Sequence, residues 1–179
     1  VQPDPFQKNL KLTIGAGMTA TLPPASLRVG AVGGIFVVSD ETKRPDEAAM
    51  ERIFARHPYS PEGTILRLAW LEGLSREEIA ALTWDQVQFE DNALTLPDRT
   101  VPLAPSAEDC LRERHRLYAQ RDPHVIISDR YQRPMPPESV SRLARTALDT
   151  EGQKVSLKDL RQDFVIRQLQ THNWTYAAR

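Results

Sequence analysis

The sequence contains a single cysteine, Cys110, and no long hydrophobic run. One thiol cannot form a disulfide within the chain, and it cannot supply a cysteine-based zinc site, which needs about four ligands. No stretch of about 18 uncharged apolar residues exists, so a transmembrane helix is excluded. The apolar stretches near the start are broken by Gly, Pro and Lys, so no signal peptide is predicted. We therefore expect a reduced, cytoplasmic protein without membrane contact.

A strong net charge is missing as well, because 23 Lys and Arg face 24 Asp and Glu in 179 residues. The hydrophobic content of 40% is enough for a packed core, which excludes wholesale disorder. The balance hides an asymmetry, since residues 1–110 have a net charge of −6 and residues 111–179 a net charge of +5. A basic second half is where an anionic partner would bind. From charge alone, ordinary variation in surface composition is the favoured interpretation.

The first 45 residues differ from the rest in their proline and glycine content and in their short β-type runs at residues 27–32 and 34–38. The glycines lack the spacing of a phosphate-binding loop, so turns explain them better. We predict that residues 1–45 form an extended or β-rich arm. The first residue is Val1 rather than Met, which suggests a piece of a longer protein.

From residue 46 the pattern becomes mainly helical. Ser60-Pro61-Glu62 is a typical helix start, and Ser75 and Glu78 have the spacing of a capping box. The nearly continuous apolar character of residues 65–71 predicts a central helix. The expected order is two helices, a short capped helix, three strands, a helix, an extended run and two more helices, at residues 46–57, 61–73, 75–82, 87–89, 93–96, 100–103, 107–120, 125–127, 137–148 and 156–170.

This order, together with several short motifs, resembles the catalytic domain of the tyrosine recombinases, the phage integrase family. The stretch EGLSREEIAALTWDQV at residues 72–87 is similar to the family's first motif, with Gly73, Glu78 and Trp84 at matching positions. Val101-Pro102-Leu103 is similar to the step that closes the family's β-meander. The resemblance implies an α+β, mainly helical fold with a small three-stranded antiparallel sheet, in which residues 46–179 form a catalytic domain that lacks its final helices.

The resemblance also implies a chemistry: DNA strand breakage and rejoining through a phosphotyrosyl intermediate, without metal or cofactor. Two arginines hold the phosphate oxygens, because a guanidinium donates two parallel hydrogen bonds and stays charged. Residues 158–162, KDLRQ, lie at the family's second motif, so Arg161 matches its second arginine and Lys158 takes the place of a histidine. The slot of the first arginine holds Ser75, and Arg76 comes one place late, which rotates it by about 100° on a helix.

Two further groups of the family are missing at the expected positions. Residues 87–103 contain no lysine, and the only cation there is Arg99, which cannot readily serve as a general acid. Tyr176 and His172 come too early for the family's nucleophile and third-motif histidine. Either the chain ends before the nucleophile, or it is a degenerate relative that retains the fold and some DNA affinity. We predict that this polypeptide does not cleave DNA.

The expected partner is double-stranded DNA, with a homo-oligomer assembled on it. Besides Arg99, the candidate DNA contacts lie on one predicted helix: Arg112 and Arg116 share a face, as do Arg114 and Arg121. A solvated helix face is the alternative for these four residues.

Two other classes of function remain open. GLSREEIAAL at residues 73–82 resembles the first helix and turn of a helix-turn-helix regulator, which would require a recognition helix directly afterwards. A protein-interaction module is the other alternative, with residues 1–45 as a self-association or partner-binding segment.

Overall fold

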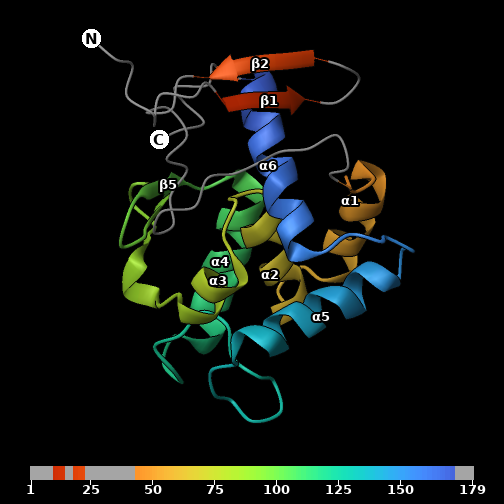
Figure 1. Ribbon diagram of the computed structural model, residues 1–179. Coiled ribbons are helices and arrows are strands. Elements are labelled where there is room, and N and C mark those ends of the chain that lie inside the picture. Colours follow the sequence, from red (N-terminus) through yellow and green to blue (C-terminus); the bar gives the residue numbers. More distant parts are fainter. Residues whose placement is uncertain (1–9, 15–17, 23–42, 172–179) are drawn as a thin grey trace. The chain divides into compact units, whose positions relative to one another are not determined.

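The computed structural model describes residues 10–14, 18–22 and 43–171 (Figure 1). The chain divides into two compact units, one of residues 43–164 and one of residues 1–42 and 165–179. In the latter, β1 (Leu10–Ile14) pairs antiparallel with β2 (Met18–Leu22), with Leu10 opposite Leu22. The β-type runs at residues 27–32 and 34–38, and also His172 and Tyr176, lie outside the described residues. The division of the sequence at residue 45 stays a prediction.

The unit of residues 43–164 begins with two capped helices. α1 (Glu47–Arg56) starts after Asp46, whose carboxylate accepts a hydrogen bond from the Ala49 amide at 3.3 Å. α2 (Pro61–Trp70) starts after Ser60, whose hydroxyl accepts from the Gly63 amide at 3.2 Å. Nearly all of α2 is buried, and it contacts α1, α3, α4 and α5. The prediction of a central helix is therefore confirmed.

A small sheet follows the short helix α3 (Arg76–Ala81) and a single turn of 3-10 helix, η2 (Trp84–Gln86). Its strands β3 (Val87–Gln88), β4 (Ala93–Thr95) and β5 (Thr100–Pro102) are antiparallel in that order. Val87 and Val101 lie opposite Leu94 from either side, so the three form an apolar row on one face. The predicted three-stranded sheet is confirmed. A helix-turn-helix needs a recognition helix where these strands lie, so that alternative is wrong.

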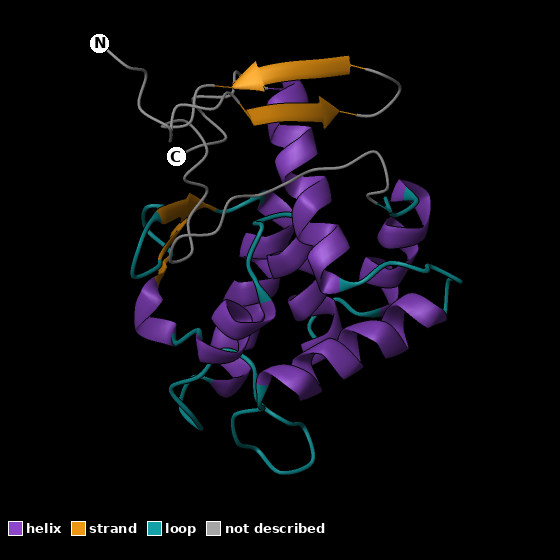
Figure 2. Cartoon of the chain, in the orientation of Figure 1, coloured by secondary structure: helices purple, strands orange, loops and turns teal. Residues whose placement is uncertain are grey.

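Three longer helices complete the fold: α4 (Pro105–Tyr118), α5 (Pro137–Asp149) and α6 (Leu157–Thr171). Figure 2 shows that helices make up most of this unit, with the short strands grouped at one side. Between α4 and α5, residues 125–127 are fully buried, and isolated bridges join Thr83 to His124 and Ile127 to Pro134. The run is extended, as predicted, but it forms no regular strand.

The core is apolar except at a few buried polar side chains. One of them, Arg67 in the middle of α2, makes hydrogen bonds to three helices or their ends. Its guanidinium donates to the carbonyls of Phe54, His57 and Gly63 at 2.8–3.1 Å and to the Ser106 hydroxyl at 3.0 Å. These bonds connect α1, α2 and α4. Cys110 is buried beside Thr64, with no disulfide.

Candidate nucleic-acid interface

The site begins at the turn between α2 and α3. Gly73 has a φ of +72°, a conformation that glycine adopts without strain, and a Cβ there would lie 2.4 Å from the Phe164 ring. The Ser75 hydroxyl accepts from the Glu78 amide at 3.2 Å, and the Glu78 carboxylate accepts from the Ser75 amide at 2.8 Å. The predicted capping box is therefore present, and it fixes the Glu78 carboxylate at the start of α3.

Arg99, in the turn between β4 and β5, binds this same carboxylate. Its two terminal nitrogens lie 2.7 and 3.0 Å from the two oxygens of Glu78, and one of them also lies 3.1 Å from Asp98. The Arg99 side chain is only 9% exposed. Burial alone would lower the pKa of Arg99, but the hydrogen bond and charge of Glu78, assisted by Asp98, outweigh it and raise the pKa. Arg99 therefore stays charged and is a poor proton donor.

Arg161, on α6, contacts the same turn between α2 and α3. Its Nε donates to the Gly73 carbonyl at 3.0 Å, and the side chain is half-buried. The pKa of Arg161 is lowered, chiefly by burial; the charge of Glu78 opposes this shift, and the charge of Arg99 adds to it. The fold thus brings Arg161, Glu78 and Arg99 within electrostatic reach of one another, although they come from three separate elements.

Glu78 is ionised at neutral pH in this arrangement. Burial alone would raise its pKa, but the hydrogen bonds from Arg99 and Ser75 and the charges of Arg99 and Arg161 bring the pKa below its ordinary value. One carboxylate therefore interacts with two guanidiniums. We call Glu78, Arg99 and Arg161 the ionic cluster.

The other residues of the predicted phosphate site are more exposed. Lys158 lies one turn before Arg161 on α6, in a position where the two can share a face. Arg76 is exposed and pairs with its neighbour Glu77 at 2.7 Å. The phosphate-binding roles of Arg161, Lys158 and Arg76 stay predictions.

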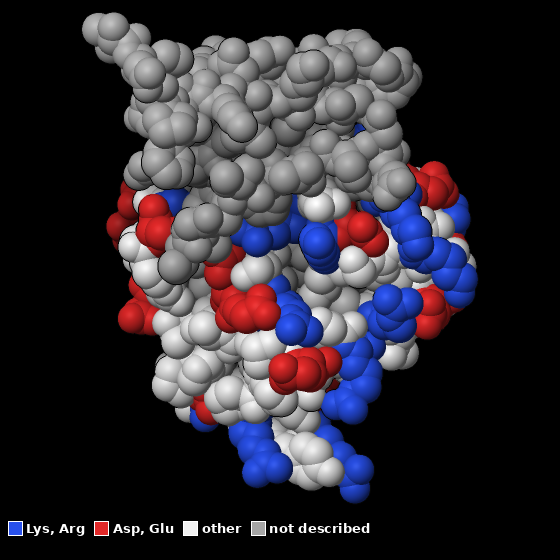
Figure 3. Space-filling view, in the orientation of Figure 1, with Lys and Arg blue, Asp and Glu red and all other residues white. Residues whose placement is uncertain are grey.

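Arg112 and Arg116 are exposed on α4, and each pairs with a carboxylate on the same helix, so their role as DNA contacts stays a prediction. Arg112 also lies over the Phe89 ring, 5.0 Å from its centre. Figure 3 shows basic and acidic side chains interspersed over the face it presents.

Arg114 corrects the interpretation of this helix. Its side chain is fully buried, and it donates to the carbonyls of Tyr59 at 2.7 Å and Val125 at 3.1 Å. The interpretation of Arg114 as a DNA contact is therefore wrong. Arg121, which was grouped with it, is exposed and donates to Gln132.

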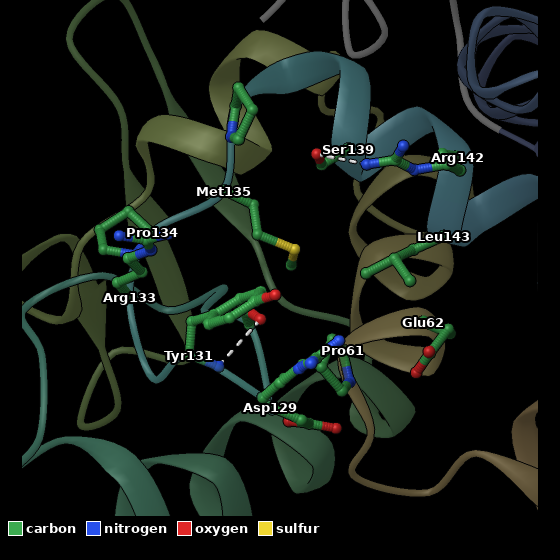
Figure 4. A pocket seen from close by; sticks show the side chains of 13 residues that line it. Pro61, Glu62, Asp129, Tyr131, Arg133, Pro134, Met135, Ser139, Arg142 and Leu143 are labelled. Carbon is green, nitrogen blue, oxygen red and sulfur yellow. Dashed lines mark hydrogen bonds between the residues drawn. The ribbon is translucent and has the colours of Figure 1, made fainter.

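A hollow that the sequence did not reveal lies between the start of α2, the loop before α5 and the first turns of α5 (Figure 4). Its volume is about 440 Å³. Tyr131, which is 57% exposed, lies between Arg130 and Arg133, whose guanidiniums are 5.2 and 5.1 Å from its ring centre. The run RYQR at residues 130–133 was the signal available in the sequence.

Within the described ranges, no group of three or more His, Cys, Asp or Glu side chains has an arrangement that could hold a metal ion. Among the helices of the same residues, none has the length and apolar character needed to cross a membrane.

No protein-family profile matches the sequence, and no curated protein matches it either. Solved structures do match. A XerA recombinase superposes with a TM-score of 0.62 at 18% identity, over 70% of this chain and 50% of that one. The lambda integrase catalytic core gives a TM-score of 0.54 at 17% identity, over 72% of this chain and 88% of that one. The chain has the fold of a tyrosine recombinase catalytic domain.

A third match extends the recombinase-like fold to a transposon protein. The Tn1549 transposon integrase, in complex with a circular intermediate DNA, gives a TM-score of 0.55 at 15% identity, over 79% of this chain and 60% of that one. The chain spans about half the length of the XerA recombinase and 56% of a lambda integrase fragment bound to a core site. The recombinase-like domain described here thus corresponds to part of these proteins.

Proposed function

We propose that this recombinase-like domain binds double-stranded DNA, with Arg161 holding a backbone phosphate, and that the polypeptide does not cleave the DNA it binds. The observation that carries the proposal is the position of Arg161, which is anchored to the Gly73 carbonyl beside the capped start of α3. A guanidinium held in this way is pre-oriented, so less conformational entropy is lost when it binds phosphate.

The proposed lack of cleavage is supported by what the ionic cluster lacks. Phosphoryl transfer to a tyrosine requires a proton donor for the leaving oxygen. Residues 87–103, the meander in which the family has a lysine, contain none, and the cation there is Arg99, whose pKa is raised by Glu78 against the effect of burial. The slot of the first arginine holds Ser75, whose hydroxyl is used as a helix cap. Among the described residues, the ionic cluster therefore offers one anchored arginine for a phosphate and no general acid.

The similar structures support the proposed partner. Two lambda integrase structures are of a dimer bound to a core site and of a tetramer bound to a Holliday junction. We infer the same class of partner here, a DNA duplex, and assembly of several copies on it.

The experiment is a titration of a labelled DNA duplex with the full polypeptide at several salt concentrations. We expect binding that weakens steeply with salt, with Arg161→Gln reducing both the affinity and the salt slope, the latter by about one. A nicked suicide substrate incubated with the same protein should yield no covalent adduct. Undetectable duplex binding at low salt would refute the first half of the proposal, and an accumulating adduct would refute the second.

A protein-interaction role for residues 1–45 is the second candidate. It is supported by the β1–β2 hairpin, which lies in a segment that the sequence already marked as apolar and β-rich. Deletion of residues 1–44 followed by light scattering tests it, because an unchanged mass and stability would contradict a role in self-association.

A further inference from the structure

The ionic cluster places the negative charge of Glu78 near Arg161, the residue proposed to bind a phosphate, and Arg99 neutralises this charge. Glu78 is the charged group with the largest effect on the pKa of Arg161, ahead of Arg99, Asp98 and Glu77. The Glu78 carboxylate binds the Ser75 amide, two residues after the carbonyl that accepts from Arg161, so it would repel a phosphate that approached this guanidinium. An unpaired Glu78 carboxylate would therefore weaken the binding of a phosphate to Arg161.

Glu78 is nevertheless needed where it is. Its carboxylate closes the capping box with the Ser75 amide and so fixes the first turn of α3. Gly73, whose carbonyl accepts from Arg161, lies in the α2–α3 turn, two residues before Ser75. Glu78 therefore stabilises the segment that orients Arg161, the residue proposed to bind a phosphate.

Arg99 neutralises this acid from the side of the sheet. Its guanidinium binds both Glu78 oxygens, and its side chain is only 9% exposed, so the pair is held in a fixed geometry. Bidentate pairing of this kind is the strongest that an arginine makes with a carboxylate. Arg99 itself has little surface left with which to reach a ligand.

Resting on the DNA-binding function proposed above, we propose that Arg99 is a positioning residue: it neutralises Glu78 and so weakens the repulsion that a DNA phosphate meets beside Arg161. Arg99 does not contact the DNA itself. This role replaces the direct contact that the sequence suggested for Arg99. It also explains why an arginine in the meander is useful although it cannot act as the family's general acid.

The test is a charge cycle in the full polypeptide, read out as affinity for a fluorescent DNA duplex over a range of salt concentrations. Arg99→Gln leaves Glu78 unneutralised, and we expect roughly tenfold weaker binding with an unchanged salt slope. Glu78→Gln should bind at least as tightly as the wild type, because glutamine still closes a capping box. The double variant E78Q/R99Q should return to within about twofold of the wild type.

The pair Arg52 and Glu151, which are 2.8 Å apart on another part of the unit, provides the matched control. Arg52→Gln should change the affinity by less than about twofold, because exposed pairs contribute little. Thermal unfolding of every variant identifies loss of fold. If Arg99→Gln fails to fold, two other variants take its place. Arg99→Lys keeps the charge and should bind DNA like the wild type. Glu78→Gln then tests whether the Glu78 charge opposes DNA binding.

Three results would overturn the inference. These are a double variant that binds as weakly as Arg99→Gln at equal thermal stability, a salt slope that falls by about one in Arg99→Gln, and a folded Glu78→Gln that binds more weakly than the wild type. Each of these leaves the proposed function standing, provided that the wild type binds and Arg161→Gln weakens it. A wild type that does not bind DNA overturns both.

Discussion

The arginines of this domain fall into two groups that differ in their partners. Arg67 and Arg114, in α2 and α4, are 6% and 0% exposed and donate to backbone carbonyls. Arg99, in the β4–β5 turn, and Arg161, on α6, both interact with the Glu78 carboxylate, and Arg161 also donates to the Gly73 carbonyl. Burial lowers the pKa of both core arginines and of Arg161, whereas Glu78 raises that of Arg99.

The difference separates structural arginines from ligand-directed ones. A core arginine satisfies carbonyls that would otherwise be buried without a partner, so its value lies in the fold. Arg99 and Arg161 take part in a charge balance that an added anion can change, and we propose that they contribute to binding. The four predictions below test this division, from the largest expected effect to the smallest.

Arg114→Met should have the largest effect on stability. The substitution leaves the Tyr59 and Val125 carbonyls without their donor in the core, and we expect unfolding to become easier by about 3 kcal/mol. Urea denaturation followed by circular dichroism measures it. A loss below 1 kcal/mol, roughly the value of a surface substitution, would mean that Arg114 is not a structural hub.

Gly73→Ala should reduce stability by about 2 kcal/mol. Alanine is strained at a φ of +72°, and its Cβ would meet the Phe164 ring at 2.4 Å. Because the Gly73 carbonyl orients Arg161, DNA affinity should fall as well. The matched control is Gly152→Ala, where φ is also positive, at +64°. There the added Cβ would have no atom of a residue beyond its two chain neighbours within 4 Å. If both variants lose the same stability, backbone strain alone is responsible and the contact with Phe164 is irrelevant.

Acidification should destabilise the wild type more than Glu78→Gln. The pKa of Glu78 is lowered on folding from its ordinary value of 4.5, so its contribution is fully present above that value and is lost as the pH falls through the folded-state pKa. The difference in the free energy of unfolding between the wild type and Glu78→Gln should therefore narrow as the pH falls from 5. We expect this change to be smaller than the stability that Gly73→Ala loses. Parallel curves over this range would show that Glu78 is not stabilised in its charged form.

Arg116→Gln should leave the free energy of unfolding almost unchanged, since Arg116 is exposed and pairs with Glu113 on the same helix. It is the counterpart of Arg114→Met two residues away. If Arg116 contacts a phosphate, its salt slope for DNA should fall by about one while stability is retained. An unchanged slope would assign Arg116 to the solvated surface.

Much of the fold was predictable because its signals are local. The capping box of Ser75 and Glu78, the start of α2 at Ser60-Pro61 and the three strands after Trp84 each depend on residues a few positions apart. The burial of Arg114 was not predictable, because helical spacing does not say which neighbours cover a charged residue. The acceptors of Arg114, in Tyr59 and Val125, come from segments 55 and 11 residues away.

The sequence by itself determined the order of elements, the capped helices and the absence of the expected lysine and first arginine, since these follow from residue types and short spacings. Only the tertiary structure decided that Arg99 pairs with Glu78, 21 residues away, and that Arg161 is anchored to Gly73, 88 residues away. Such pairings depend on how helices and strands pack in three dimensions. By charge alone each arginine could pair with many carboxylates of the sequence, and packing brings only one or two of them within reach.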